Sequence, residues 1–131
     1  MPDLAQLLRE AKTIAVVGLS SQRFRASFGV SAYMQSRGYR IIPVNPNERE
    51  VLGEKAYPDL ASVPVPVDIV NVFRRSEFVP EVVAAAIAIN AKGIWMQEGV
   101  VHEEAAEAAR KAGLEVVMDT CILKEHRRLL G

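Results

Sequence analysis

The chain has 131 residues, and its 16 basic side chains balance 16 acidic ones, so its formal net charge at pH 7 is zero. This length suits one domain with one hydrophobic core, and we expect a single domain over residues 1–131. Without a basic excess, we expect neither nucleic acid nor a membrane surface as a partner. A local basic pocket for a phosphorylated small molecule remains compatible with this balance.

Cysteine usage and the apolar runs point to a cytoplasmic protein. The one cysteine, Cys121, cannot form an intrachain disulfide, which is typical of a reducing compartment. The N-terminus lacks a basic segment followed by an apolar core. The longest apolar run, Val82–Ile89, has eight residues, whereas a membrane span needs about 20.

The first third of the chain is predicted to form two strands, each preceded by a helix. Thr13–Val17 is an apolar run without polar alternation, as in strands buried on both faces. Val30, Tyr33 and Met34 share one helical face. In chain order, the expected elements are a helix over 4–11 with Asp3 as its cap, a strand over 13–17, a helix that stops at Gly38, and a strand over 39–44.

Residues 48–66 are the least regular stretch, because one glycine and three prolines interrupt them; we expect loop and a short helix there. The regular alternation then resumes. In chain order, the expected elements are a strand over 68–73, a helix capped by Ser76 and running to Asn90, a strand over 93–96, a helix over 103–112 stopped by Gly113, a strand over 114–118, and a short basic tail.

Alternating strands and helices at this spacing predict right-handed βαβ units. The fold class is therefore α/β: a doubly wound, mostly parallel five-stranded sheet with helices on both faces. In such sheets ligands bind beyond the carboxyl ends of the strands, where the strand order reverses. The strand tips to inspect are 18–21, 45–47, 73–75, 97–99 and 119–121.

The loop after the first strand suits a phosphate group. Gly18 lets the chain turn, and the following helix offers free N–H groups and the positive end of its dipole. Further donors and charge would come from Ser20, Ser21, Arg23, Arg25 and Ser27. These residues favour a pyrophosphate, and the alternative is an ordinary turn with solvated arginines.

The same loop departs from the dinucleotide fingerprint. It has one glycine where GxGxxG has three. A nicotinamide site also needs an acidic residue at the end of the second strand, where this chain has Val44-Asn45-Pro46 and Glu48 lies further on. NAD is therefore disfavoured.

The other tips leave alternatives open. Asn45-Pro46 is either a site for the adenosine-phosphate end of a nucleotide or a structural turn. Phe73 and Arg74 either stack on adenine and contact a phosphate, or are a core side chain and a solvated one.

At the fourth tip, Trp95 is expected in the core. Met96 and Gln97 are candidates to line a cleft, and Gly99 would allow close backbone approach.

No catalytic or metal site is predicted. Asp119, Cys121 and His126 fall within eight residues, but nothing in the sequence makes them converge. Two separated histidines and one cysteine do not form a metal cluster, and Cys121 is expected to be a small buried residue.

Several phrases, in this order and spacing, resemble the small stand-alone CoA-binding proteins. These are single Rossmann-like domains related to the N-terminal CoA-binding domain of the succinyl-CoA synthetase α subunit. The resemblance extends from about Ile14 to Cys121. The phrases are IAVVGLS (14–20), Arg25-x-Ser27, GYRIIPVNP (38–46), VLGEKAY (51–57), VDIVNVFR (67–74), AKGIWMQEGV (91–100) and VVMDTC (116–121).

The resemblance implies coenzyme A as the ligand. It places the pyrophosphate near Gly18, Ser20, Ser21, Arg25 and Ser27. It places the adenosine-phosphate end near Val44, Asn45 and Pro46, flanked by Val72, Phe73 and Arg74, and the pantetheine side near Met96, Gln97 and Gly99. The chain departs from the family at Thr120, where an arginine is common, and at Ile122-Leu123, where a proline is common.

The resemblance does not imply ligase activity. In the synthetase a separate domain carries the phosphorylated histidine, and His102 and His126 lie in no similar context. The sequence therefore favours a non-catalytic module that carries, senses or delivers CoA or an acyl-CoA, with an unidentified protein partner as one recipient. The alternatives are an NAD(P)-binding oxidoreductase or accessory protein, a redox protein forming a Cys121–CoA mixed disulfide, and a structural protein with a vestigial cleft.

Overall fold

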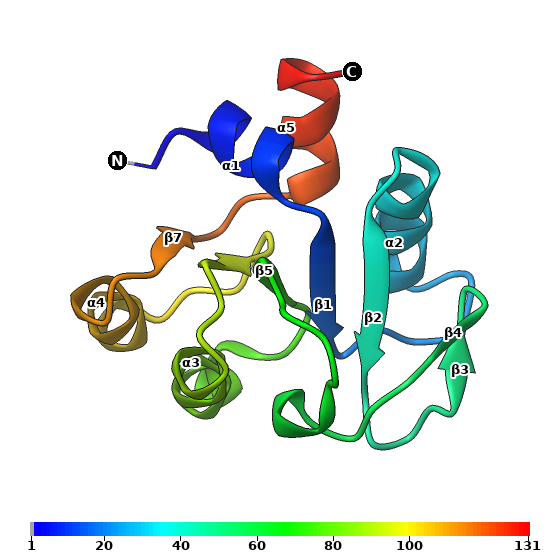
Figure 1. Cartoon of the computed structure of the whole chain (residues 1–131), viewed down its shortest axis with the longest axis horizontal. Helices are drawn as coiled ribbons and strands as arrows, with labels where there is room; N and C mark the ends of the chain where they lie inside the picture. The colour runs from blue at the N-terminus through cyan, green and yellow to red at the C-terminus, as the bar shows by residue number, and fades with distance from the viewer. Residues whose placement is uncertain (1) are drawn as a thin grey trace.

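The computed structural model describes residues 2–131 and contains a five-stranded parallel sheet with helices on both faces (Figure 1). The strands lie side by side in the order β2-β1-β5-β6-β7, and each neighbouring pair is parallel. Their bounds are β1 (Thr13–Val17), β2 (Arg40–Val44), β5 (Ile69–Val72), β6 (Gly93–Met96) and β7 (Glu115–Val117). The predicted α/β architecture is confirmed.

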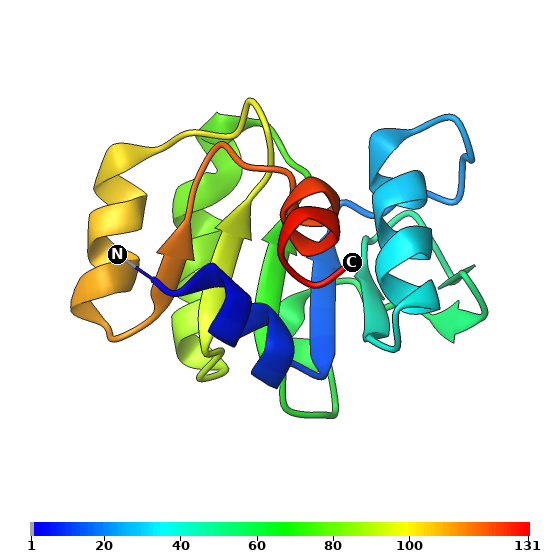
Figure 2. The same ribbon diagram turned by 90° about the horizontal axis from the view of Figure 1, so that it is seen from above.

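The sheet separates two apolar layers, because successive residues of a strand point to opposite faces. In β1, Ala15 and Val17 pack with α3 (Val79–Ala88) and α4 (Glu103–Lys111). Ile14 and Val16 pack toward the opposite face. That face is covered by α1 (Leu4–Glu10), α2 (Ala26–Ser36) and α5 (Ile122–Leu129), and Figure 2 looks onto it, with α1 and α5 in front of the strands.

Side-chain caps begin two of the helices. Asp3 accepts the backbone N–H of Gln6 at the start of α1, as predicted. His102 caps α4 through its ring nitrogen, Nδ1, which accepts the N–H of Ala105 at 3.1 Å. By contrast, α2 has no side-chain cap and no acidic residue in its first turn. No capping or first-turn side chain therefore compensates the positive dipole end at the start of α2.

Two expectations about helices were wrong. Ser76 does not cap α3: it begins a separate 3-10 turn, η2 (Ser76–Phe78), and its hydroxyl accepts the N–H of Val101 at 2.9 Å. The expected basic tail is instead the helix α5, whose Ile122 and His126 are buried while its charged side chains point outward. Buried residues four apart are the helical signal in this short segment.

The irregular stretch forms a hairpin followed by a short helix. The hairpin pairs β3 (Glu50–Val51) with β4 (Glu54–Lys55), and the helix η1 covers Leu60–Ser62. Tyr57 then makes a parallel bridge to Val44 at the end of β2. This bridge brings residues 57–60 beside the carboxyl ends of the strands.

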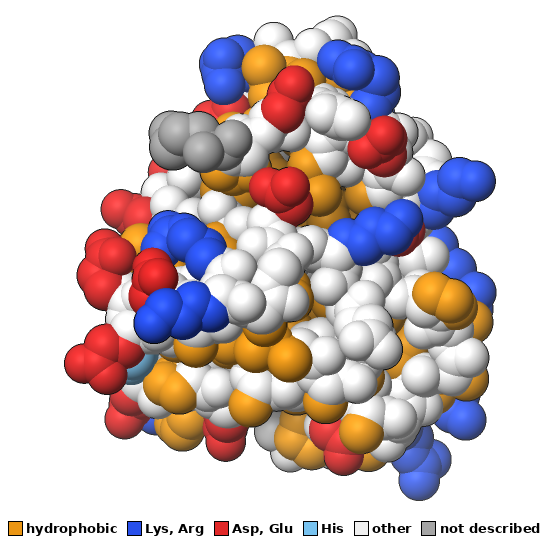
Figure 3. Space-filling view, turned by 60° about the vertical axis from the view of Figure 1, so that its left-hand side comes forward, with side chains coloured by type: hydrophobic (Ala, Val, Ile, Leu, Met, Phe, Trp, Pro, Cys, Tyr) orange, Lys and Arg blue, Asp and Glu red, His pale blue; other side chains and the backbone are white. Residues whose placement is uncertain are grey.

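On the surface, charges of both signs are interspersed over the face drawn in Figure 3. Within residues 2–131, none of the helices is both long and apolar enough to cross a membrane.

Candidate functional site

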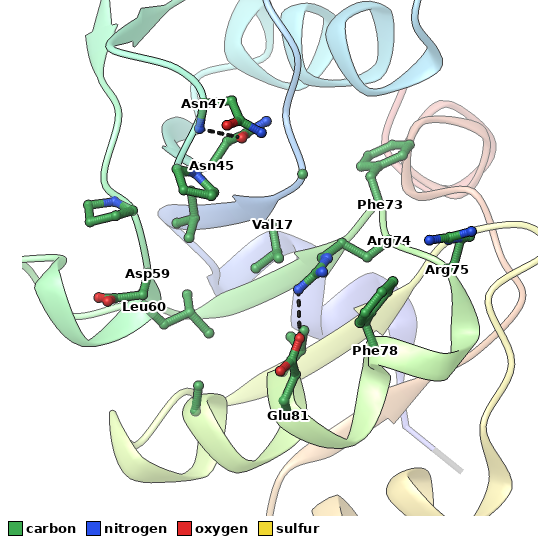
Figure 4. Close-up of a pocket in the computed structure, with 16 residues that line it drawn as sticks. Val17, Asn45, Asn47, Asp59, Leu60, Phe73, Arg74, Arg75, Phe78 and Glu81 are labelled. Atoms are coloured by element: carbon green, nitrogen blue, oxygen red, sulfur yellow. Dashed lines mark hydrogen bonds and ion pairs between the residues drawn. The ribbon is translucent and has the colours of Figure 1, made fainter.

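A cavity of about 580 Å³ opens beyond the carboxyl ends of β1, β2 and β5 (Figure 4). This is where the strand order reverses, since β2 lies on one side of β1 and the later strands lie on the other. Six of the residues proposed from the sequence line the cavity: Gly18, Val44, Asn45, Pro46, Phe73 and Arg74.

Gly18 joins the three strand tips. Its N–H donates to the carbonyl of Val44 at 2.9 Å, and its φ of 90° lies in the left-handed region. A Cβ at this position would overlap the carbonyl oxygen of Phe73. Only glycine fits here without backbone movement, so the first strand tip can approach the third closely.

Two arginines line the cavity, Arg75 and Arg74, and Arg74 is the less exposed of the two. Its guanidinium carbon lies 4.1 Å from the centre of the Phe78 ring, and Nη1 lies 2.8 Å from a carboxylate oxygen of Glu81. Figure 4 shows Arg74 reaching from the end of β5 toward Glu81, with Phe78 beside it. Because the Arg74 side chain is 35% exposed, its remaining donors are accessible to an anionic ligand.

The first loop lies next to the cavity but does not line it. Ser27 is buried, and its Oγ accepts the N–H of Ser20 at 3.1 Å. Ser21 donates its N–H to Glu48 at 2.8 Å, and Asn45 donates a side-chain N–H to the carbonyl of Leu19 at 3.0 Å. The loop is thus held by side chains of the turn that follows β2.

Arg23 and Arg25 extend into solvent at the end of this loop. Between them Phe24 is 81% exposed, and the Arg25 guanidinium carbon lies 5.7 Å from its ring centre. The two predicted arginines therefore lie outside the cavity, at the approach to the uncapped start of α2.

The fourth tip and Val72 differ from the expectation of a cleft lining. Val72, Met96 and Gln97 are all buried. Gln97 donates to Oδ1 of Asn71 at 2.5 Å, and its Oε1 accepts the N–H of Ile122 at 3.4 Å. These three side chains are part of the buried interior under the strand tips, and none of them lines the cavity.

Gly99 lies in the turn beyond β6, away from the cavity lining. Its N–H donates to Oδ1 of Asp119 at 2.7 Å, which ties the fourth strand tip to the fifth. Its φ of 83° again uses the conformational freedom of glycine.

The far wall of the cavity was missed from the sequence. Phe78, Glu81, Val82 and Ala85 line it from η2 and α3, at helical spacing directly after a predicted strand tip. That spacing could have identified one face of the helix as a wall of the site. Pro58, Asp59 and Leu60 complete the wall from the segment before and within η1, and no local pattern places them there.

The residues capable of chemistry have structural roles. Cys121 is buried at the start of α5, so a mixed disulfide with a ligand thiol would require the thiol to become exposed. The carboxylate of Asp119 accepts the hydrogen bond from the Gly99 N–H. Trp95 is fully buried, as expected for a core residue, and its indole N–H donates to the carbonyl of Thr120. Over residues 2–131, no three His, Cys, Asp or Glu side chains gather as metal ligands.

His126 is buried against two tyrosines. Its Nδ1 lies 3.0 Å from the hydroxyl of Tyr33, and both Tyr33 and Tyr39 contact its ring edge-on. Burial, and then the positive charge of Arg37, lower the pKa of His126.

Known proteins similar to this chain include a family of CoA binding domains and small proteins of about the same length. Residues 12–127 match a family model described as a CoA binding domain. The protein YneT of Bacillus subtilis (strain 168) is 46% identical over 124 residues, which are 95% of this chain and 92% of that protein. A solved structure of a hypothetical protein from Pyrococcus horikoshii OT3 matches with a TM-score of 0.96 at 38% identity, over 98% of this chain and 91% of that one.

A larger relative is an enzyme. Acetate–CoA ligase (ADP-forming) II of Archaeoglobus fulgidus is 31% identical over 111 residues. The aligned region is 83% of this chain but 16% of the ligase. The similarity to this enzyme therefore concerns a small part of it.

Proposed function

The chain belongs to the family of CoA binding domains, and on this premise we propose that it binds coenzyme A or an acyl-CoA without transforming it. Its role would be to carry, sense or deliver this ligand. The observation that carries the proposal is the cavity at the reversal of strand order, with an arginine stacked on an aromatic ring at its edge.

The cavity suits the nucleotide end of the ligand. Its volume of about 580 Å³ is of the size that small-molecule sites have. Apolar side chains such as Val17, Leu60 and Val82 offer contacts to the adenine ring, and Arg74 offers donors to a phosphate. The uncapped N-terminus of α2 and the loop before it would take the pyrophosphate, and the pantetheine arm would leave along the strand tips toward Gly99.

A binding role without chemistry agrees with how the reactive side chains are used. His102 caps a helix, His126 is enclosed by two tyrosines, and Cys121 is buried. A general base or nucleophile must instead reach the reacting atoms. The activity of the much longer ligase is not assigned to this chain.

Calorimetric titration with CoA, dephospho-CoA, NAD and NADP tests the proposal. We expect heat with CoA, and we expect Arg74→Gln to weaken CoA binding by roughly tenfold, because one charged hydrogen-bond donor is lost. Arg110→Gln is the matched control, because Arg110 is also paired with a glutamate, Glu107, but lies on α4 away from the cavity. Clear binding of NADP with no heat from CoA would overturn the proposal in favour of the NAD(P) alternative.

A further inference from the structure

Glu48 brings a negative charge to the loop that is proposed to receive the pyrophosphate. Its Oε2 accepts the backbone N–H of Ser21 at 2.8 Å, across 27 residues of sequence. The side chain is half-buried. Within residues 2–131, no lysine or arginine forms an ion pair with this carboxylate.

The turn after β2 positions this carboxylate. Oδ1 of Asn45 accepts the N–H of Asn47 at 2.9 Å, and the carbonyl of Asn45 accepts the N–H of Glu48 at 3.2 Å. The Asn45 side chain also donates to the carbonyl of Leu19. One turn thus holds both ends of the Leu19–Ser21 segment, by an amide at Leu19 and by a carboxylate at Ser21.

Two further amides of the loop are also engaged, but by neutral groups. Ser20 donates its N–H to Ser27 Oγ, and Gln22 donates its N–H to Ser20 Oγ, each at 3.1 Å. These contacts leave the hydroxyls able to rotate and donate to a ligand. At Ser21 the acceptor is anionic, and it takes the single hydrogen that the amide offers.

We infer that Glu48 is an internal competitor of the ligand's phosphate groups. This inference rests on the proposed function. A carboxylate oxygen and a phosphate oxygen are both anionic acceptors, and they cannot share one N–H without repelling each other. Binding of a pyrophosphate therefore requires the Glu48 carboxylate to leave Ser21, and this lowers the affinity for every ligand that carries a pyrophosphate at this loop.

The competition has a chemical signature. It acts on CoA, dephospho-CoA and ADP, which share the pyrophosphate, and it spares adenosine, which has none. Most differences in affinity between related complexes lie in the dissociation rate. A lowered affinity therefore means faster release of the ligand, which suits a protein that delivers it.

The test compares Glu48→Gln with wild type by calorimetry in buffer containing EDTA, so that no divalent cation bridges carboxylate and phosphate. Glutamine keeps the size and an acceptor oxygen but removes the charge. We expect the dissociation constants for CoA and ADP to fall by about fivefold or more, with adenosine unchanged. Glu50→Gln is the matched control, because Glu50 is a glutamate two residues further on that is exposed in β3, whereas the carboxylate bonded to the Ser21 N–H is that of Glu48.

Where wild type binds CoA, unchanged or weaker binding of CoA by Glu48→Gln overturns the inference, and so does an equal gain in Glu50→Gln. Titration with inorganic pyrophosphate separates this result from failure of the proposed function. If neither protein binds CoA but Glu48→Gln binds pyrophosphate more tightly than wild type, the competition stands and the proposed ligand is wrong. If neither binds CoA or pyrophosphate, both are wrong.

Discussion

Gly18 is the residue on which the geometry of the candidate site depends most directly. We expect Gly18→Ala to lower the free energy of unfolding by about 1–3 kcal/mol, because alanine combines a strained positive φ with a clash against the Phe73 carbonyl. Gly29→Ala is the control: a Cβ there meets open space within α2, and alanine favours the helix by about 0.5–1 kcal/mol. Urea denaturation measures both. Equal effects of the two substitutions would contradict the account.

At the scale of elements, a buried polar pair connects β5, β6 and α5. Gln97 of the fourth strand tip bonds both Asn71 in β5 and the first amide of α5. This contact positions α5 against the sheet, although α5 is the last helix of the chain and β5 lies in the middle of the sequence. Because its hydrogen bonds are satisfied inside the protein, Gln97 can be buried at a strand tip without lining the cavity.

We expect Gln97→Leu alone to cost about 1–3 kcal/mol of unfolding free energy, because it leaves Asn71 buried without its partner. The double variant with Asn71→Leu should cost clearly less than the sum of the two single changes, since no Asn71 side chain is then left buried without its partner. The N–H of Ile122 loses its Gln97 acceptor equally in the single and the double variant. A double-mutant cycle by urea denaturation measures the coupling. Additive effects would show that the two side chains do not stabilise each other.

For the whole molecule, we expect His126 to make stability depend on pH. It lies where α5, α2 and the residue before β2 meet, and its pKa is lowered in the folded state. Above about pH 6.5, the ordinary pKa of histidine, both folded and unfolded chains hold it neutral, and it adds no pH dependence. As pH falls below that value, the unfolded chain takes up the proton first, so the contribution to stability is lost through the window down to the folded pKa.

The expected slope from this group is at most about 1.4 kcal/mol per pH unit below pH 6.5. Unfolding free energies at pH 7.5 and pH 5.5, for wild type and for His126→Gln, measure it. The wild type should lose more stability between these values than the variant, because most carboxylates remain ionised over the range. Parallel losses in the two proteins would assign the pH dependence to other groups.

The local sequence determined most of the elements and the edge at which a site should be sought. Apolar runs such as Thr13–Val17 must be covered on both faces, and this requirement yields a parallel sheet with helices on each side. Because parallel strands end at one edge, all five strand tips were predicted as places for a site, and Gly18, Asn45 and Arg74 from the first three tips do line one cavity. Their binding roles remain predictions.

Tertiary structure alone decided the rest, because it depends on contacts between distant segments. The Tyr57 bridge to β2 brings η1 to the cavity wall, and the fold seats the C-terminal helix α5 against α1 and α2. A parallel sheet specifies which strand ends are neighbours but not how far each side chain lies from the surface, so Met96 and Gln97 proved to be buried. The bond from Ser21 to Glu48 spans 27 residues, and no local pattern encodes such a pairing, because only the fold brings the two segments together.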